Sequence, residues 1–401
     1  MAVKLDMSKA YDRLEWVFIE AVLRGLGFAE EWIKLIMMCI SSVSYSVLIN
    51  GEQCGFFGAS CVIRQGDSLS PYLFLLCAEG LSHMLRKAVL ARRIFGVAAS
   101  RGGSKISHLF FADDSLLFCQ ATLSNCVEIS KVLKNYEEAS GQQLNRAKTS
   151  IFFTKNTSLE LKAQIQAMFQ VPEIKSYEKY LGLPSFVGRS KVAAFGDLKG
   201  RVWRQINGWK ERLLSHGGRE VLIKAVAQSI PTYTMSCFSL PDGLCKDLNK
   251  MFSQFWWGYH DKKKKAHWLK WSKLCDPKDR GGMSFRDIKA FNWALLVKQG
   301  WRFLQNPQSL VARVFKAKYF PGCGFMEAGI EYRASYAWRS IASARGVLKL
   351  GLSWHIGNGE SVRITEDTWL PMRLPESPNS IRDILDKNER VSTLIKRGYN
   401  V

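Results

Sequence analysis

Residues 108–118 read HLFFADDSLLF. Two apolar, aromatic-rich runs flank the adjacent carboxylates Asp113 and Asp114, and this pattern predicts a tight β-hairpin with the acids at its tip. Neighbouring carboxylates repel each other, and a divalent cation relieves that repulsion. Mg²⁺ prefers hard oxygen ligands of this kind. Taken alone, the pair also fits a solvated turn, because most acidic side chains are exposed.

The overall composition is that of an ordinary globular protein. The 401 residues are 47% hydrophobic and 23% charged. No apolar run approaches the roughly 18 residues of a membrane span, and the N-terminus lacks a signal-peptide pattern. The ten cysteines have no Cys-x-x-Cys spacing, which indicates neither a zinc site nor a disulfide framework. Reduced thiols in an intracellular protein are the simpler account.

The net charge of +22 is concentrated in one part of the sequence. Residues 1–150 hold 16 Lys and Arg against 14 Asp and Glu, whereas residues 201–350 hold 27 against 10. Such a concentration indicates a polyanionic partner. Within it, four consecutive lysines at 262–265 have two tryptophans on each side, which combines phosphate-seeking charge with stacking surfaces. A solvated Lys loop beside core tryptophans fits the same pattern.

Patterns of both helix and strand are present in the first 185 residues. The clearest is a hairpin over residues 45–57 that turns at Asn50-Gly51. Ser70 is a suitable N-cap and Pro71 a suitable first residue for the helix expected over residues 72–90. The other expected elements are strands at 3–6, 150–153 and 180–183 and helices at 14–25, 124–139 and 32–41, the last with Trp32, Leu35, Ile36 and Cys39 on one face. This order predicts an α+β fold in which helices pack on one face of a small, mostly antiparallel sheet.

Beyond residue 190 the sequence changes to helical patterns rich in Trp and basic residues. The expected helices cover residues 195–209, 220–229, 242–257, 286–304, 308–320 and 335–345. Residues 354–364 predict a short hairpin, and an irregular tail follows. We therefore expect three parts: an α+β domain over residues 1–185, a helical, basic, Trp-rich region over 186–345, and a C-terminal segment over 346–401.

Two acids fall at predicted strand ends. Asp6 ends the first expected strand and Asp113 lies at the hairpin tip, so a small sheet can bring Asp6, Asp113 and Asp114 to one point. Three carboxylates at one point suit two Mg²⁺ ions that bridge an attacking oxygen and a leaving phosphate oxygen. Spacing in sequence leaves the distances in space open.

Five segments, in order, resemble the motifs of reverse transcriptases. They are KLDMSKAYD (4–12, motif A), RQGDSLSP (64–71, motif B), FADD (111–114, motif C), GQQLNRAKTS (141–150, motif D) and YLGLP (180–184, motif E). Each alone is a weak signal, but five in family order are specific. The wording is most similar to plant LINE-type (non-LTR) retrotransposons, and the resemblance covers nearly the whole chain. It implies a right-hand polymerase palm followed by an α-helical thumb and linker region.

The resemblance gives catalytic roles to the matching acids and to one lysine. It implies that Asp6, Asp113 and Asp114 hold two catalytic Mg²⁺ ions. Lys148 matches the motif D lysine that protonates the leaving pyrophosphate, in a loop that Asn145 helps to hold. A lone lysine is otherwise a surface residue.

The resemblance also implies binding roles. Tyr11 matches the aromatic gate that excludes a ribose 2′-hydroxyl, and Gln65 and Gly66 match the loop that lies against the incoming nucleotide. Without the motifs, Tyr11 would be interpreted as a core residue, and the loop with Gln65 and Gly66 as an ordinary loop that leads into a helix. The residues expected to contact primer and other nucleic acid are Tyr180, Leu181, Gly182, Lys262, Lys263, Lys264 and Lys265.

The main hypothesis is a fragment of an RNA-directed DNA polymerase that performs Mg²⁺-dependent nucleotidyl transfer in retrotransposition. Its partners would be an RNA template, a DNA primer and deoxynucleoside triphosphates, with no membrane, and a nuclear location follows only from the family. The match begins at motif A, so we expect a truncated chain without the family's fingers and with impaired activity. The alternative is a catalytically inactive nucleic-acid-binding remnant. An intron-maturase or telomerase-like polymerase shares the palm but fits the Trp-rich region poorly.

Overall fold

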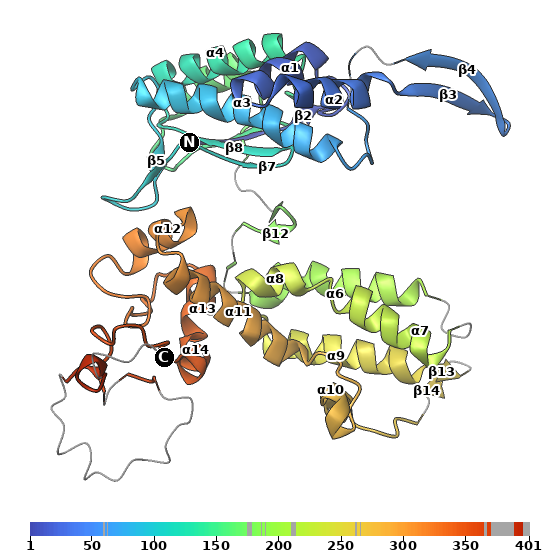
Figure 1. Cartoon of the computed structure of the whole chain (residues 1–401), viewed down its shortest axis with the longest axis vertical. Coiled ribbons are helices and arrows are strands. Elements are labelled where there is room, and N and C mark those ends of the chain that lie inside the picture. Colours follow the sequence, from blue (N-terminus) through green and yellow to red (C-terminus); the bar gives the residue numbers. More distant parts are fainter. Residues whose placement is uncertain are drawn as a thin grey trace. The chain divides into compact units, whose positions relative to one another are not determined.

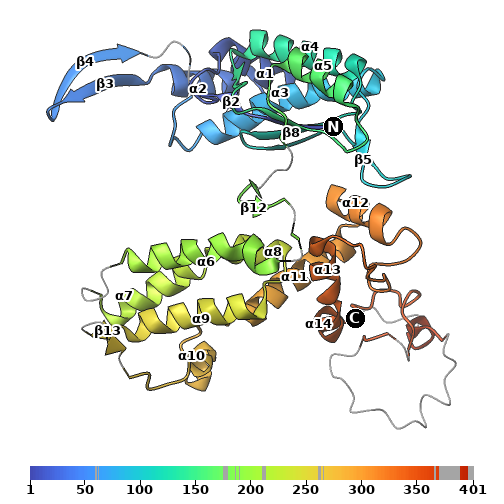
Figure 2. The same cartoon turned by 180° about the vertical axis from the view of Figure 1, so that it is seen from behind.

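The computed structural model describes residues 1–58, 61, 63–174, 179–185, 187–188, 190–209, 214–260, 263–264, 266–364, 367–369 and 389–395. These form two compact units, Met1–Gly188 (unit 1) and Arg189–Val401 (unit 2), seen from opposite sides in Figures 1 and 2. The expected mixture of helices and strands is confirmed. Among the described residues, no helix is long and apolar enough to cross a membrane. The three-part division of the chain stays a prediction.

A four-stranded antiparallel sheet organises unit 1. Its strands run in the order β10 (Ser150–Phe152), β1 (Ala2–Leu5), β8 (Asp114–Phe118) and β7 (His108–Phe111). Lys4 in β1 lies opposite Leu116 in β8 and Ser150 in β10. Because side chains alternate along a strand, Val3 and Leu5 point to one face and Lys4 points to the other.

Helices cover one face of this sheet (Figure 1). They are α1 (Trp16–Gly25), α3 (Ser70–Leu90), α4 (Leu123–Ser140) and α5 (Leu159–Phe169), the last of which the sequence patterns did not indicate. Val3 and Leu117 from the sheet form one buried core with Leu85 of α3 and Leu133 of α4. Burying each such side chain stabilises the fold by about 1.5–3 kcal/mol. This one-sided core leaves Lys4 and its neighbours on the uncovered face.

Helix α4 begins and ends at residues that its sequence marks. The Thr122 hydroxyl accepts a hydrogen bond from the Asn125 backbone N–H, which caps the N-terminus. Gly141 ends the helix with a φ of 75°, a left-handed conformation that favours glycine. A Cβ atom at position 141 would lie 2.6 Å from the Arg13 carbonyl oxygen, so this close approach also requires glycine.

Helix α2 (Glu30–Ser41) buries a different face from the one we predicted. Ile33 and Ile36 are buried, while Trp32 and Leu35 are 53% and 49% exposed and Cys39 is exposed. The apolar residues of this helix extend over two adjacent faces, so their spacing fits either face. The prediction was correct for Ile36 and wrong for Trp32, Leu35 and Cys39.

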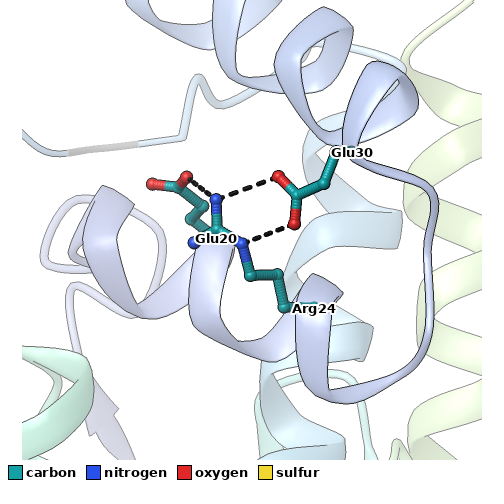
Figure 3. Close-up of polar contacts among 3 residues, drawn as sticks. All are labelled: Glu20, Arg24 and Glu30. Carbon is teal, nitrogen blue, oxygen red and sulfur yellow. Dashed lines mark hydrogen bonds and ion pairs between the residues drawn. The ribbon is translucent and has the colours of Figure 1, made fainter.

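An arginine of α1 fixes the start of α2. The Arg24 guanidinium donates to the Glu20 carboxylate at 2.6 Å and to the Glu30 carboxylate at 2.7 Å (Figure 3). Glu20 lies one turn earlier on α1 and Glu30 is the first residue of α2. These contacts hold the two helices in place at the loop that joins them.

The predicted hairpin at residues 45–57 is confirmed. Strands β3 (Ser44–Ile49) and β4 (Glu52–Gly58) pair Ile49 with Glu52, which leaves Asn50 and Gly51 as a two-residue turn. Both turn residues have positive φ, 52° and 91°. This is the backbone that the Asn-Gly pair favours. The ribbon extends away from the helices of unit 1 (Figure 1).

The N-cap prediction for α3 is wrong by one residue. Leu69 is the N-cap, and Ser70 is the first helical residue and is buried. The Asp67 carboxylate accepts a hydrogen bond from the Leu69 backbone N–H at 2.7 Å, so an Asp-based turn leads into the helix. Pro71 occupies an early helical position, as predicted.

His108, at the start of β7, has polar contacts at both ring nitrogens. Nε2 lies 3.0 Å from the Ser82 hydroxyl of α3, and Nδ1 lies 2.9 Å from the Ser107 hydroxyl. Burial, with a smaller effect of the Arg86 charge, lowers the pKa of His108 below its ordinary value. The folded chain therefore disfavours the imidazolium, so stability present above the unfolded-state pKa of about 6.5 is lost as pH falls through the folded-state pKa.

We expect His108→Gln to flatten the loss of unit 1 stability below pH ~6.5, because it removes the group that gains a proton on unfolding. Urea unfolding followed by pulse proteolysis, read on peptides of β7 and β8, measures this pH dependence. His83→Gln is the control, since His83 lies on α3 and is exposed. An unchanged pH slope in His108→Gln would exclude this role.

Unit 2 is built mainly of helices. They are α6 (Lys191–Asn207), α7 (His216–Val221), α8 (Thr232–Cys237), α9 (Asp242–Trp257), α10 (Trp271–Cys275), α11 (Ile288–Gln305), α12 (Leu310–Tyr319), α13 (Tyr336–Ser343) and α14 (Arg345–Gly351). A π-helical turn at Leu222–Ala227 continues α7. The sequence patterns did not indicate α8, which begins directly after Pro231, or α10.

The core of the C-terminal helices is aromatic. Trp338 is fully buried and stacks with Tyr319 and Phe320 at ring-centroid distances of 5.0 and 5.2 Å. The hairpin predicted at residues 354–364 is wrong for the described residues there, where an isolated bridge joins Arg363 to Arg390. Residues 371–388 lie outside the described part of the chain.

Candidate active site

A cleft of about 700 Å³ in unit 1 brings the two separate acids together. Its lining comes from four segments that are distant in sequence: residues 6–11, residues 65–71, the β7–β8 turn and the loop after β9. The lining residues are Asp6, Met7, Lys9, Ala10, Tyr11, Gln65, Gly66, Asp67, Pro71, Asp113 and Lys148. Six of the residues predicted from the sequence therefore share one cleft.

Asp113 lies in the turn of the central hairpin. Phe111 pairs with Asp114 across β7 and β8, which leaves Ala112 and Asp113 as a two-residue turn. Ala112 has a φ of 50°, in the left-handed region, and Asp113 is exposed. The hairpin prediction is confirmed, and this turn presents the Asp113 carboxylate to the cleft.

Asp114 differs from its neighbour. It is the first residue of β8, so the prediction that both acids lie at the tip is wrong for Asp114. Its carboxylate lies 3.4 Å from the Lys4 Nζ on the uncovered face of the sheet. The cleft lining does not include Asp114. The structure thus separates two acids that are adjacent in sequence.

Asp6 follows β1 and is tied to the loop that carries Lys148. The Asp6 backbone N–H donates to the Thr149 hydroxyl at 3.2 Å, and the Asp6 carbonyl accepts from the Asn145 N–H at 2.8 Å. The Lys148 N–H donates to the Asn145 carbonyl at 3.2 Å. Strand β2 (Met7–Ser8) pairs with β9 (Gln143–Leu144) and extends this connection. Asn145 therefore orders the loop, as the resemblance implied.

Tyr11 and the 64–67 loop also contribute to the lining. The Tyr11 ring stacks on Phe74 of α3, with centroids 4.9 Å apart and planes inclined by 15°. The Tyr11 carbonyl accepts from the Ile63 N–H at 3.1 Å, which joins the two segments. Gln65 donates to the Asp12 carboxylate at 3.1 Å, and Gly66 has a φ of 88° that favours glycine.

A buried hydrogen-bond network holds one of the segments that line the cleft. The Gln142 side chain, 2% exposed, donates to the Ala10 carbonyl at 2.8 Å and accepts from the Tyr136 hydroxyl at 2.9 Å. Burial raises the pKa of Tyr136, so the phenol stays protonated and remains a donor. This network anchors the segment that leads to Tyr11.

Sequence patterns did not single out Lys9 and Asp67 as site residues, although both line the cleft. Lys9 has a φ of 48° and is exposed. Lys9 and Lys148 thus place two cations in a lining that also holds three acids. The sequence could have indicated both residues, because Lys9 lies in the motif A segment and Asp67 in the motif B segment.

Some predicted contact residues lie elsewhere. Tyr180 pairs with Leu183 in the ribbon of β11 (Lys179–Tyr180) and β12 (Leu183–Pro184), and Leu181 and Gly182 form its turn. None of them is among the cleft lining. Lys263 and Lys264 form β14, which pairs with β13 (Tyr259–His260), while Lys262 and Lys265 lie outside the described residues.

The tryptophans around the Lys262–Lys265 run divide into two kinds. Trp256 is buried, and Trp271 stacks on Phe285 with centroids 4.8 Å apart, so these two belong to the core. Trp268 is 82% exposed and is available for contact. For Trp256 and Trp271 the structure therefore agrees with the alternative reading, in which tryptophans of this region belong to the core.

The acids of the cleft fit a divalent cation that binds together with a ligand. No group of three or more His, Cys, Asp or Glu side chains among the described residues is arranged to hold a metal ion alone. Mg²⁺ usually binds through one or two carboxylates plus substrate phosphates rather than in an all-protein cage. Asp6 and Asp113 supply two such carboxylates in one cleft, while Asp114 forms an ion pair with Lys4 at 3.4 Å.

Residues 1–184 match the family model for reverse transcriptase (RNA-dependent DNA polymerase). An uncharacterized mitochondrial protein of Arabidopsis thaliana is 42% identical over 151 residues, which cover 37% of this chain and 98% of that protein. The Pol polyprotein of the retrotransposable element R2DM of Drosophila melanogaster is 27% identical over 196 residues, 47% of this chain but 18% of the polyprotein. Residues 1–184 therefore belong to the reverse transcriptase family, and the match to the R2DM element agrees with the retrotransposon resemblance.

Among solved structures, the telomerase of Candida albicans in complex with a fragment of telomeric RNA is similar. The match is 12% identical, covers 78% of this chain and 50% of that chain, and has a TM-score of 0.34.

Proposed function

We propose that unit 1 is the palm of an RNA-directed DNA polymerase and that its cleft performs Mg²⁺-dependent nucleotidyl transfer to a primer. The helices of unit 2 are then the thumb and linker. The observation that supports the proposal is that segments of motifs A, B, C and D line one cleft, with Asp6 and Asp113 among the lining residues. The family assignment supplies the reaction class.

Each lining residue has a role that its chemistry allows. Asp6 and Asp113 would hold Mg²⁺ together with the triphosphate oxygens, and Mg²⁺ supplies charge stabilisation to the transferring phosphoryl group. Lys148 would donate a proton to the leaving pyrophosphate, and hydrogen bonds from its backbone N–H to Asn145 support its loop. Lys9 adds a second cation for the triphosphate. Asp114 positions β8 through Lys4 and does not join the cleft.

Tyr11→Ala is expected to lower the preference for deoxynucleotides over ribonucleotides by about tenfold or more. The ring stacked on Phe74 is the bulky group of the lining on the side of the 64–67 loop, so its removal opens room for a 2′-hydroxyl. One added group in a pocket typically changes selectivity by about 10–200-fold. Single-nucleotide incorporation of dTTP and UTP measures the ratio. Tyr11→Phe is the control and should keep it, and an unchanged ratio in Tyr11→Ala would remove Tyr11 from this role.

Two surfaces are proposed for nucleic acid. The β11–β12 ribbon, with Tyr180, Leu181 and Gly182, would contact the primer strand, and Lys262–Lys265 would contact phosphates. Residues 201–350 contain 27 basic and 10 acidic residues, and this excess of positive charge supports phosphate contact by the lysine run. Both proposals follow the family roles of the matching residues.

The alternative function is a nucleic-acid-binding remnant without catalysis. The same basic excess favours it, because phosphate binding needs no intact cleft. Primer extension on poly(rA)–oligo(dT) with dTTP and Mg²⁺, comparing the chain with Asp113→Ala, separates the two. If the chain is a polymerase, it should incorporate dTTP and the Asp113→Ala variant should not. Equal background incorporation by both, with template binding that weakens steeply in salt, supports the remnant.

A further inference from the structure

Unit 1 contains a second hollow, of about 390 Å³, away from the acidic cleft. Arg92, Ile94, Phe95, Gly96, Lys105 and Ser107 contribute to its lining. Strand β7 runs from His108 beside this hollow to the turn that carries Asp113, so the two sites lie at opposite ends of the strand. Strand β5 (Val97–Ala98), which borders the hollow, lies near the N-terminus in both views (Figures 1 and 2).

Close backbone packing builds this hollow. Arg92, two residues after the last residue of α3, has a φ of 55°, in the left-handed region. The Phe95 N–H donates to the side-chain carbonyl of Asn125, which is 1% exposed, at 2.9 Å. A Cβ atom at Gly96 would lie 2.7 Å from the Ile106 carbonyl, so the ribbon of β5 and β6 (Lys105–Ile106) packs against residue 96. The walls are therefore ordered parts of the fold.

The residues that line the hollow belong to a segment whose Lys and Arg residues are not matched by any Asp or Glu. Residues 80–112 contain six Lys and Arg and no Asp or Glu, whereas the rest of residues 1–150 holds ten Lys and Arg against 14 acids. Arg86 and Arg93 of this segment are neutralised by Glu79 and Glu128. Arg92, Arg101 and Lys105 are exposed, and none of them forms an ion pair with an acid of the described residues.

The hollow also offers an aromatic surface. Phe95 lines the hollow and is 40% exposed, although its backbone N–H is held by the Asn125 side chain. Cations beside an accessible ring suit a single strand, whose phosphates bind the cations while an unpaired base stacks on the ring. Complementing the α3 dipole would explain Arg92 but not Lys105, which belongs to β6, or Arg101, which lies in the turn between β5 and β6.

We propose that this hollow binds single-stranded nucleic acid outside the catalytic cleft, with Arg92, Arg101 and Lys105 on phosphates and Phe95 stacked on one base. The proposal rests on the proposed function only in that nucleic acid is the partner. The site would hold a strand at the end of the sheet away from Asp113, independently of nucleotide and Mg²⁺.

The test uses the full chain with a fluorescein-labelled 20-nucleotide strand, as RNA and as DNA of the same sequence, without nucleotide or Mg²⁺. Anisotropy over a salt series gives the slope of log K against log[salt]. The variant Arg92→Glu/Arg101→Glu/Lys105→Glu removes about three phosphate contacts, so the slope should become shallower by about 2. Lys34→Glu/Lys131→Glu/Lys134→Glu, three exposed lysines of the same unit, makes the same change in net charge and should keep the slope.

Phe95→Ala should weaken binding about tenfold at fixed salt. A strand with one 4-thiouridine or 4-thiothymidine should cross-link to the tryptic peptide of residues 94–101. Thermal melts check that each variant is folded. Equal slopes for both triple variants, or no cross-link to that peptide, would overturn the proposal. Competition by poly-glutamate through the same three residues would overturn it in favour of an acidic protein partner. Asp113→Asn should keep this binding, so a failed polymerase and a failed hollow give different results.

Discussion

Asp113→Asn is expected to lower the rate of Mg²⁺-dependent primer extension by about 10³-fold or more, whereas Asp114→Asn should cost about tenfold. The two acids are adjacent in sequence, but only Asp113 is part of the cleft lining. Loss of a metal-binding carboxylate removes several kcal/mol of transition-state stabilisation, and about 4 kcal/mol corresponds to 10³ in rate. Asp114 contacts Lys4 at 3.4 Å on the sheet surface, so its loss affects the site through β8 only.

Steady-state rates over a Mg²⁺ titration measure both variants. Glu138→Gln, an exposed change on α4, is the control and should keep the full rate. Lys4→Met should resemble Asp114→Asn, because it breaks the same ion pair. If Asp114→Asn were as inactive as Asp113→Asn, both acids would act at the metal, and the separation of the pair described above would be wrong.

Asn292→Leu is expected to destabilise unit 2 by about 3–6 kcal/mol. Asn292 is 4% exposed on α11, and its side-chain carbonyl accepts from the Leu240 N–H at 2.8 Å. Its amide donates to the carbonyls of Met235 and Phe238, at 2.8 and 2.9 Å, where α8 ends. Leucine would leave three buried backbone groups without partners, each costing about 1–3 kcal/mol.

Tryptophan fluorescence during urea unfolding measures this loss, because 11 of the 13 tryptophans lie in unit 2. Lys298→Leu places the same side chain at an exposed position of α11 and should change stability by less than about 0.5 kcal/mol. Domains are typically stable by only about 5–15 kcal/mol, so the unfolding midpoint of Asn292→Leu should fall far below the control. Equal midpoints would show that α8 does not depend on this side chain.

The central hairpin could be predicted because two kinds of local information agree. The apolar runs on either side of Asp113 specify paired strands, and the acids can only be accommodated at a turn or an edge. Asp6 was placed with Asp113 by the same reasoning, since both follow strands of one small sheet. The structure brings both into the lining of one cleft, 107 positions apart in the sequence.

The position of Asp114 could not be predicted without knowing the register in which β7 and β8 pair. A two-residue turn at Ala112 and Asp113 makes Asp114 the first residue of β8, on the same face as Lys4. A turn one residue longer would have placed both acids at the tip. Sequence patterns do not decide between these turns, because FADD contains no glycine or asparagine that would mark positive φ.

The buried face of α2 and the presence of the short helix α8 could not be predicted from the sequence either. Helix α2 has apolar residues on two adjacent faces, and burial of Ile33 instead of Trp32 depends on α1 and α3, which pack against it. Helix α8 has six residues and depends on the side chain of Asn292, from a different helix. Both features are decided by tertiary contacts that local propensity does not contain.

If the cleft is a polymerase active site, Asp6 and Asp113 should bind a divalent cation together with a nucleotide. Mn²⁺, followed by the electron paramagnetic resonance signal of the free ion, replaces Mg²⁺ in a titration with dTTP. We expect the chain to bind Mn²⁺ more tightly with dTTP than without, Asp6→Asn and Asp113→Asn each to abolish this gain, and Asp114→Asn to keep it. Equal Mn²⁺ binding by the chain and by Asp113→Asn in the presence of dTTP would show that Asp113 does not hold the cation.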